Sequence, residues 1–156
     1  DMNSLFASDM WGTVVEELAK EMDYGSKFGH VTHVVGIESR GFVVGSALSN
    51  EMLKPFVMVR KKGAKYPGKL LEETYELEYG SDTLTLQEGI LGHTSRVLIA
   101  DDLVATGGSM DATKRLIEKT GATVVGGITI INLKYLNQED LFNDKFELVS
   151  GLEVMK

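Results

Sequence analysis

The feature that most constrains this chain is an apolar, strand-like run that ends in two carboxylates and leads through a glycine turn into a helical stretch. Residues 96–100 form the run, Asp101 and Asp102 follow, and residues 106–109 read Thr-Gly-Gly-Ser before a helical pattern begins. In an open α/β sheet, ligands bind beyond the carboxyl ends of the strands, where such a loop presents backbone N–H groups and a helix N-terminus. The segment therefore predicts a parallel sheet with an anion-binding loop at its edge.

Two strand–helix–strand units account for most of the chain. Residues 31–37 form a β-branched run, a helical pattern follows, and residues 56–59 form a second short strand. The other unit joins strands over residues 96–100 and 123–131 through a second helix. Parallel strands need such crossover helices, so the pattern predicts an α/β fold.

The remaining segments have other patterns. Apolar residues recur at helical spacing over residues 11–22 and predict an amphipathic helix. Residues 60–92 contain two alternating stretches around Gly80-Ser81-Asp82, which is typical of a β-hairpin. We expect a short helix over residues 136–142 and a last strand over residues 146–149.

Length and composition are those of a soluble globular protein. The 156 residues suffice for one core, so we expect a single domain over residues 1–156. A net charge of −7 disfavours nucleic-acid binding, which rests on cationic side chains. No apolar run approaches the roughly 20 residues of a membrane helix, and the chain has no cysteine for disulfides. We therefore expect a cytoplasmic protein that binds neither nucleic acid nor membrane.

The loop after the acidic pair has the chemistry to hold a phosphate monoester. Gly107 and Gly108 allow close backbone approach and positive φ, and the hydroxyls of Thr106 and Ser109 can donate to phosphate oxygens. The two carboxylates before the loop can accept hydrogen bonds from the hydroxyls of a sugar whose 5-phosphate occupies it. A simple chain reversal is the alternative for either motif alone. Neither a Walker phosphate loop nor a dinucleotide fingerprint is present.

With these motifs, residues 97–109 resemble the signature that binds phosphoribosyl pyrophosphate in type I phosphoribosyltransferases. Residues 36–42, and residues 60–68 with 75–80, resemble the adenine-specific branch of that family. The resemblance covers nearly the whole chain. It implies a type I phosphoribosyltransferase fold, a twisted, mainly parallel sheet flanked by helices, with a flexible β-hairpin lid over about residues 61–92.

The resemblance implies an enzyme of purine salvage. Such a pentosyl transferase moves 5-phosphoribosyl from phosphoribosyl pyrophosphate to adenine and releases AMP and pyrophosphate. Mg²⁺ would bind through substrate oxygens, with no direct protein ligand, and a homodimer is expected. Residues 1–6 resemble the continuation of an N-terminal hood that is incomplete in this sequence. Two alternatives stay open: a 6-oxopurine (xanthine or hypoxanthine-guanine) enzyme, which Lys134 would suit, and a noncatalytic donor-sensing regulator of the same fold.

The turn after the first strand is a second candidate anion site. Its backbone amides and the Arg40 guanidinium can converge on one anion. In the family that the chain resembles, this loop binds pyrophosphate and often contains a cis peptide bond, here between Glu38 and Ser39. The cationic run that begins at Arg60 resembles family residues that contact the pyrophosphate. Residues 63–68 form a segment one residue longer than in many relatives, which leaves the roles of the lysines open, so Arg60 is the stronger candidate. The candidate pyrophosphate residues are Glu38, Ser39, Arg40, Arg60, Lys61 and Lys65.

The resemblance assigns the other site residues by role. Glu78 corresponds to a lid residue proposed as acid/base toward the purine or as a stabiliser of developing charge, and Tyr79 belongs to the same lid, which would keep water out. Leu133 would pack against the base. The 5-phosphate loop comprises Ala105, Thr106, Gly107, Gly108 and Ser109, and the ribose hydroxyls are assigned to Asp101 and Asp102. The catalytic candidates are Glu78, Arg40 and Asp102.

Overall fold

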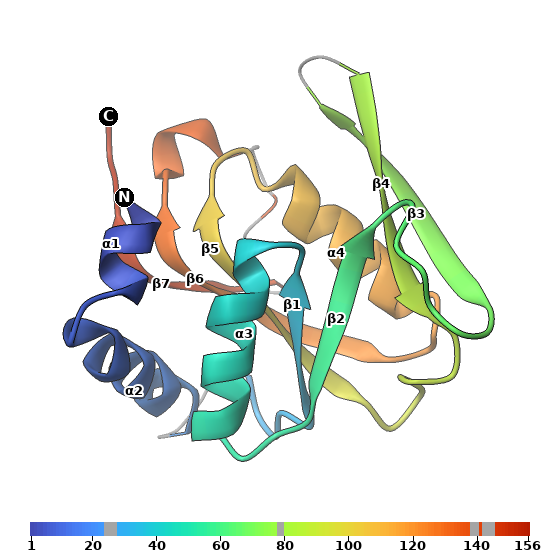
Figure 1. Ribbon diagram of the computed structural model, residues 1–156, viewed down its shortest axis with the longest axis horizontal. Coiled ribbons are helices and arrows are strands. Elements are labelled where there is room, and N and C mark those ends of the chain that lie inside the picture. Colours follow the sequence, from blue (N-terminus) through green and yellow to red (C-terminus); the bar gives the residue numbers. More distant parts are fainter. Residues whose placement is uncertain (24–27, 78–79, 138–140, 142–145) are drawn as a thin grey trace.

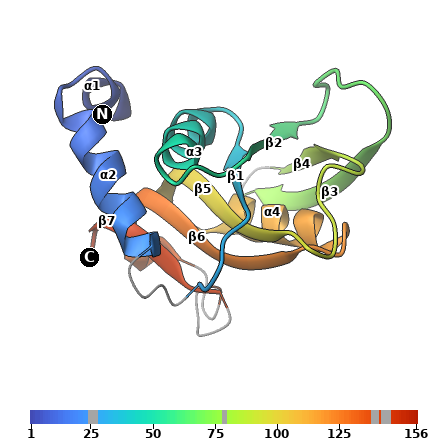
Figure 2. The same ribbon diagram turned by 90° about the horizontal axis from the view of Figure 1, so that it is seen from below.

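The computed structural model of the chain is a sheet with helices on both faces (Figures 1 and 2). It describes residues 1–23, 28–77, 80–137, 141 and 146–156. The strands in this part are β1 (His33–Ile37), β2 (Phe56–Lys61), β3 (Leu70–Leu77), β4 (Gly80–Gln87), β5 (Arg96–Val104), β6 (Thr123–Asn132) and β7 (Leu148–Glu153). The helices are α1 (Met2–Phe6), α2 (Met10–Asp23), α3 (Arg40–Glu51) and α4 (Gly108–Glu118), with a 3₁₀ helix η1 (Lys134–Leu136).

The two predicted strand–helix–strand units form the centre of the sheet, whose strand order is β3-β4-β2-β1-β5-β6-β7. β1 pairs in parallel with β2 on one side and with β5 on the other, and β5 pairs in parallel with β6. The chain thus moves outward from β1 to β2 and, in the opposite direction, from β5 to β6. The carboxyl ends of β1 and β5 form a topological switch point, where open α/β sheets bind ligands. The predicted fold class is confirmed.

The core divides between the two faces of the sheet because successive strand side chains point to opposite sides. Val34 packs with Leu48 of α3 in the cluster that α2 also covers. Its neighbour Val35 belongs to the cluster beneath α4, together with Leu116. Figure 2 shows α2 and α3 on one face and α4 on the other. α2 confirms the amphipathic helix that the sequence predicts over residues 11–22.

The hairpin of β3 and β4 leans away from the rest of the sheet (Figure 1). Its strands are antiparallel and pair from Leu70 with Gln87 to Leu77 with Gly80. The predicted turn at residues 80–82 is therefore wrong, since these residues begin β4 and pair with β3. Gly80 has a φ of 99°, which explains a glycine inside this strand.

β2 and β5 continue beyond the ends that their apolar runs predict. Arg60 and Lys61 were expected after the second strand. They belong to β2 because both residues pair with β4. β5 includes Asp101 and Asp102 and ends at Val104, because it pairs with β6 to its last residue. Arg60 and Lys61, like Asp101 and Asp102, therefore lie at paired strand ends rather than in loops.

The terminal segments also differ from the prediction. Residues 2–6 form α1, where no helix was expected, and the Asp1 carboxylate accepts from the backbone N of Asn3 at 3.0 Å. The last strand is β7 rather than residues 146–149, because it follows the parallel register of β6. Of the predicted helix over residues 136–142, Leu136 ends η1, Asn137 and Leu141 are not helical, and the other four residues lie outside the described part of the chain. Within the described residues, no helix is long and apolar enough to cross a membrane.

Candidate active site

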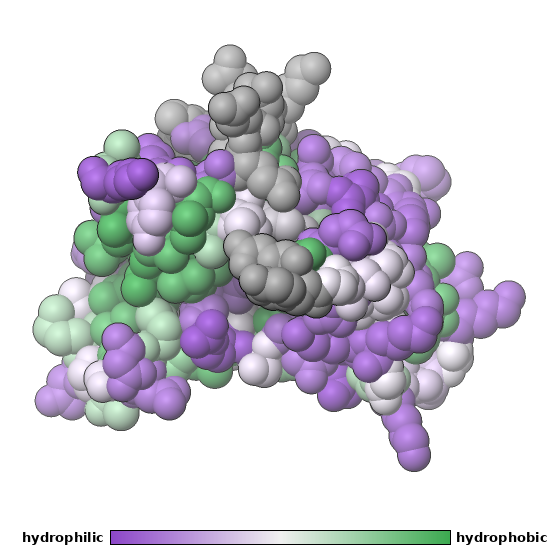
Figure 3. Space-filling view, turned by 90° about the horizontal axis from the view of Figure 1, so that it is seen from above, coloured by the Kyte–Doolittle hydropathy of each residue, from purple (hydrophilic) through white to green (hydrophobic). Residues whose placement is uncertain are grey.

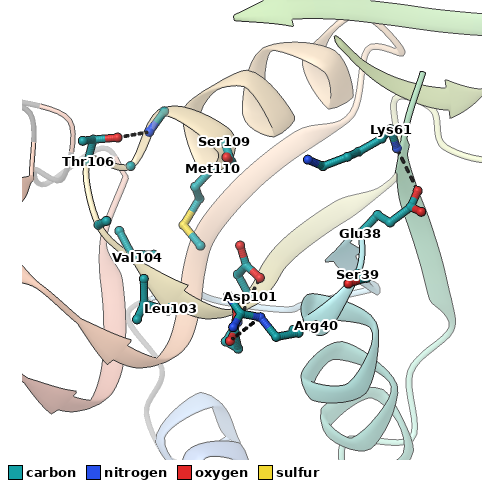
Figure 4. A pocket seen from close by; sticks show the side chains of 14 residues that line it. Glu38, Ser39, Arg40, Lys61, Asp101, Leu103, Val104, Thr106, Ser109 and Met110 are labelled. Atoms are coloured by element: carbon teal, nitrogen blue, oxygen red, sulfur yellow. Dashed lines mark hydrogen bonds and ion pairs between the residues drawn. The ribbon is translucent and has the colours of Figure 1, made fainter. Parts of the chain in front are cut away.

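A cavity of about 400 Å³ lies at the topological switch point (Figure 4). Three segments far apart in the sequence line it: residues 38–40 of the β1–α3 turn, Lys61 at the end of β2, and residues 101–110 from β5 into α4. Figure 3 looks onto this edge of the sheet and shows apolar surface toward α1 and β7, with hydrophilic surface toward the hairpin. The charged side chains of the cavity wall are two cations, Arg40 and Lys61, and three carboxylates, and the loop before α4 adds backbone N–H groups that can bind an anion.

The loop between β5 and α4 presents a helix N-terminus to the cavity. Gly107 caps α4 with a φ of 89°, a left-handed conformation that favours glycine, and the helix has no side-chain cap hydrogen bond. The first N–H groups and the positive end of the α4 dipole are thus directed at the cavity. Asn137 donates from Nδ2 to the Ala105 carbonyl at 2.6 Å and ties the loop to the segment after η1.

Asp101 and Asp102 have different surroundings although they are adjacent. Asp102 is 3% exposed, and its Oδ2 lies 3.0 Å from Nε of Arg40, as an ion pair. Asp101 accepts at Oδ1 from the backbone N of Asp102 at 2.9 Å. Burial, followed by the neighbouring Asp102 charge, raises the pKa of Asp101 to about 7, against the opposing effects of that backbone hydrogen bond and of Arg40. Near neutral pH, the Asp101 carboxyl can therefore both donate and accept toward hydroxyl groups.

The turn between β1 and α3 is tied to β2 through its glutamate. Glu38 accepts at Oε2 from the backbone N of Lys61 at 2.9 Å and pairs with Nε of Arg60 at 3.3 Å. The predicted cis peptide bond between Glu38 and Ser39 is confirmed. A Cβ on Gly41 would lie 2.9 Å from a backbone and a carboxylate oxygen of the end of β5, so glycine allows the turn and β5 to approach closely. Ser39 and Arg40 remain on the cavity wall.

The cationic run divides between the cavity and its surroundings. Lys61 lines the cavity, and its Nζ lies 2.8 Å from Oδ2 of Asp82. Arg60 is not among the lining residues: its guanidinium pairs with the glutamate of the turn and stacks 5.6 Å from the ring centre of Tyr66. Lys65 does not line the cavity either. Alternate strand residues point to opposite faces, which explains why neighbouring cations separate. The assignment of all three to pyrophosphate stays a prediction.

The remaining candidates do not line the cavity or are not described. Glu78 and Tyr79 are outside the described residues. Leu133 donates its backbone N to the carbonyl of Val104 at 2.8 Å, which holds it beside the end of β5, although it does not line the cavity. Lys134, on which the 6-oxopurine alternative depends, pairs with Glu153 at 2.7 Å.

Several residues approach the site without a signal in the local sequence. Residues 103–104, to which no role was assigned within the signature, and Met110 of α4 also line the cavity. Tyr75, Asp82 and Asn137 contact cavity residues from distant segments. A correct hairpin register would have found Asp82, since that register places it opposite Tyr75 and close to the end of β2.

Comparison with known proteins covers nearly the whole chain. Residues 3–152 match the family model described as the phosphoribosyl transferase domain. The adenine phosphoribosyltransferase of Rhodospirillum rubrum is 44% identical over 137 residues, 87% of this chain and 77% of that protein. The crystal structure of the Rhodothermus marinus adenine phosphoribosyltransferase matches with a TM-score of 0.88 at 36% identity, over 99% of this chain and 85% of that one. The Saccharomyces cerevisiae enzyme, crystallised in complex with adenine, matches with a TM-score of 0.87 at 31% identity, over 97% and 85% of the two chains.

Proposed function

Since the chain belongs to the adenine phosphoribosyltransferase family, we propose that the cavity at the ends of β1 and β5 is the site of 5-phosphoribosyl transfer. The reaction transfers this group from phosphoribosyl pyrophosphate to adenine and gives AMP and pyrophosphate, a pentosyl transfer in purine salvage. One observation carries the assignment of the site: two anion-binding loops and a carboxylate pair converge on one cavity.

The three parts of the donor match three parts of the cavity wall. The 5-phosphate is assigned to residues 105–109, whose backbone and hydroxyls adjoin the N-terminus of α4. The ribose hydroxyls are assigned to Asp101 and Asp102, and the pyrophosphate to residues 38–40 with Lys61. α3 begins at Arg40, so two helix N-termini adjoin the cavity and their dipoles favour a ligand with several negative charges.

Arg40 is proposed to stabilise the charge that develops on the departing pyrophosphate. Its guanidinium is already oriented, because the buried carboxylate of Asp102 lies 3.0 Å from Nε and leaves the other guanidinium N–H groups for the ligand. As pyrophosphate leaves, C1 of the ribose gains positive charge, and exclusion of water protects it from hydrolysis. The hairpin is proposed to close over the donor for this reason. Glu78 keeps its proposed role as acid/base toward the purine or as a stabiliser of the developing charge. Tyr79 is proposed to belong to the lid, and Leu133 is proposed to pack against the base.

Mg²⁺ is proposed as the cofactor, held mainly by the substrate. Among the described residues, no group of three or more His, Asp or Glu side chains could hold a metal. The two adjacent carboxylates of Asp101 and Asp102 nevertheless form an oxygen-rich wall, which fits a hard cation that shares its ligands with pyrophosphate, ribose and water. Asp101 and Asp102 would hold it indirectly, through ribose hydroxyls or water. When bound, the ion would neutralise charge on the leaving group.

Turnover of phosphoribosyl pyrophosphate with each purine tests the proposed function. We expect AMP and pyrophosphate from adenine, and much slower turnover of hypoxanthine, guanine and xanthine. Lys134 forms an ion pair with Glu153, which supports adenine over the 6-oxopurine alternative. Preference for a 6-oxopurine would overturn the base assignment, and donor binding without turnover of any purine would favour the noncatalytic regulator.

Two further parts of the proposal concern assembly, which rests on the family, and location, which rests on the composition of the chain. We propose that the chain forms a homodimer, which light scattering of the purified protein tests. We also propose that it works in the cytoplasm, which cell fractionation tests. A monomeric mass across the assay concentrations, or recovery outside the cytoplasmic fraction, would contradict them.

A further inference from the structure

The hairpin carries a carboxylate beside the cavity that the assignments above do not use. Asp82 lies near the start of β4, and its side chain is 22% exposed. Both carboxylate oxygens are engaged: Oδ1 accepts from the backbone N of Thr83 at 2.8 Å, and Oδ2 lies 2.8 Å from Nζ of Lys61. The carboxylate is thus fixed in orientation while it contacts a lysine that lines the cavity.

The strand register explains why Asp82 and Lys61 meet. Lys61 pairs with Leu84 at the last bridge between β2 and β4. Asp82 lies two residues from Leu84, so it projects from the same face of β4 and is a diagonal neighbour of Lys61. Figure 4 shows the Lys61 side chain extending from the end of β2 toward Ser109, on the other side of the cavity. Asp82 therefore binds the ammonium where this side chain reaches the cavity.

Tyr75 extends these contacts to the phosphate loop. It pairs with Asp82 across the hairpin and is 8% exposed, and its hydroxyl accepts from Oγ of Ser109 at 3.3 Å. The ion pair with Lys61 lowers the pKa of Asp82, and hydrogen bonding by the Tyr75 hydroxyl acts in the same direction. The same ion pair raises the pKa of Lys61, so both partners are charged at neutral pH. A chain of contacts thus leads from Ser109 through Tyr75 and Asp82 of the hairpin to Lys61. Ser109 and Lys61 lie on opposite sides of the cavity (Figure 4).

A neighbouring ion pair on the same hairpin serves as an internal comparison. Lys62 pairs with Glu72 at 3.1 Å, but both side chains are about half exposed or more, at 64% and 47%, and neither lines the cavity. The two pairs join adjacent lysines to carboxylates of the hairpin, and only the pair of Lys61 and Asp82 reaches the ligand site.

We propose that Asp82 is a positioning residue for the donor: it holds the ammonium of Lys61 at the wall of the cavity, where that ammonium meets the pyrophosphate of the bound donor. One carboxylate contact leaves two of the three ammonium N–H groups for the ligand. The proposal rests on the proposed function of this cavity. It assigns Asp82 no contact with substrate.

The test compares steady-state kinetics of Asp82→Asn and Glu72→Gln with those of the wild type. We expect Asp82→Asn to raise KM for phosphoribosyl pyrophosphate by about two- to fivefold while kcat changes by less than about 1.5-fold, a size typical of one partly exposed ion pair. Glu72→Gln should leave both constants unchanged. An unchanged or lowered KM in Asp82→Asn overturns the proposal, and a lowered KM would show that Asp82 competes with the donor for Lys61.

The double variant separates positioning from a general effect on the hairpin. In the Lys61→Ala background, Asp82→Asn should change KM by less than about 1.5-fold, because the residue to be positioned is gone. An equal rise in both backgrounds overturns the proposal. Calorimetric titration with phosphoribosyl pyrophosphate repeats the comparison without turnover. If the wild type binds this donor but does not convert adenine, the proposed function is wrong. If the wild type turns over normally and Asp82→Asn binds the donor with unchanged affinity, only the present inference is wrong.

Discussion

Replacing Asp101 by Asn should reveal how much burial of this carboxyl costs the folded state. The pKa of Asp101 rises from 3.8 to about 7 on folding, chiefly because burial disfavours the charged form. A rise of about three units corresponds to about 4 kcal/mol, an upper limit because the Asp101 side chain stays partly exposed to solvent, which screens the effect. Asn keeps the side-chain shape and the oxygen that accepts from the backbone N of Asp102, and it removes the ionisable group.

The sign of the effect follows from proton binding. Below pH 3.8 the Asp101 carboxyl is protonated in both the folded and the unfolded chain, so ionisation contributes nothing to stability. Between pH 3.8 and about 7 the unfolded chain ionises first, and the wild type loses stability as the pH rises. Above about pH 7 both states are ionised and the cost is constant. Asp101→Asn has no ionisable group at this position and lacks this cost. The free energy of unfolding of the variant should therefore increase relative to that of the wild type as the pH rises.

Urea unfolding at pH 5 and pH 8 measures this difference, with fluorescence of the single tryptophan, Trp11, as the probe. Relative to the wild type, Asp101→Asn should be more stable at pH 8 than at pH 5 by about 1 to 3 kcal/mol, the part of the limit that lies between these pH values. Asp9→Asn, which removes an exposed aspartate, is the matched control. The same stability difference at both pH values would refute the reasoning.

Two further substitutions test the close approach of the turn and β5, and the anion role of the turn. Gly41→Ala places a Cβ 2.9 Å from oxygens of Ala100 and Asp101 and should destabilise the chain by about 1–3 kcal/mol. Gly12→Ala is the control, since Gly12 lies in α2 with open space around it, and it should not destabilise the chain. Equal melting temperatures of the two variants would contradict this reasoning. Arg40→Ala should lower kcat/KM with adenine by about 10²–10³-fold. It should also lower the melting temperature, because it leaves the buried Asp102 carboxylate without its ion-pair partner. Wild-type turnover in that variant, with circular dichroism as the control for folding, would show that the anion site is misplaced.

Much of the fold could be predicted because its strands and helices show in the local pattern of apolar residues. The strands near Val34 and Leu98 are buried on both faces, so each appears in the sequence as a continuous apolar run. Their connections are amphipathic helices, which identify the parallel topology. The glycine turn between β5 and α4 could be predicted for a similar reason, since Gly107 adopts a left-handed conformation that favours glycine.

The tertiary structure decided the features that depend on pairing between distant residues. The apolar run of β5 ends at Ala100, yet the strand continues to Val104 because β6 continues to pair with it. Likewise, Lys61 lies at the end of β2 because β4 pairs there, and no local signal indicates that pairing.

The electrostatics of the site likewise came from the folded chain. The sequence predicted that Asp101, Asp102 and Arg40 surround one ligand, and the resemblance of residues 97–109 to a known signature indicated the class of that ligand. It could not show that Arg40 pairs with Asp102 while burial raises the pKa of Asp101. Desolvation and ion pairing depend on distances across the sheet, and these are set only when the two strand–helix–strand units pack together.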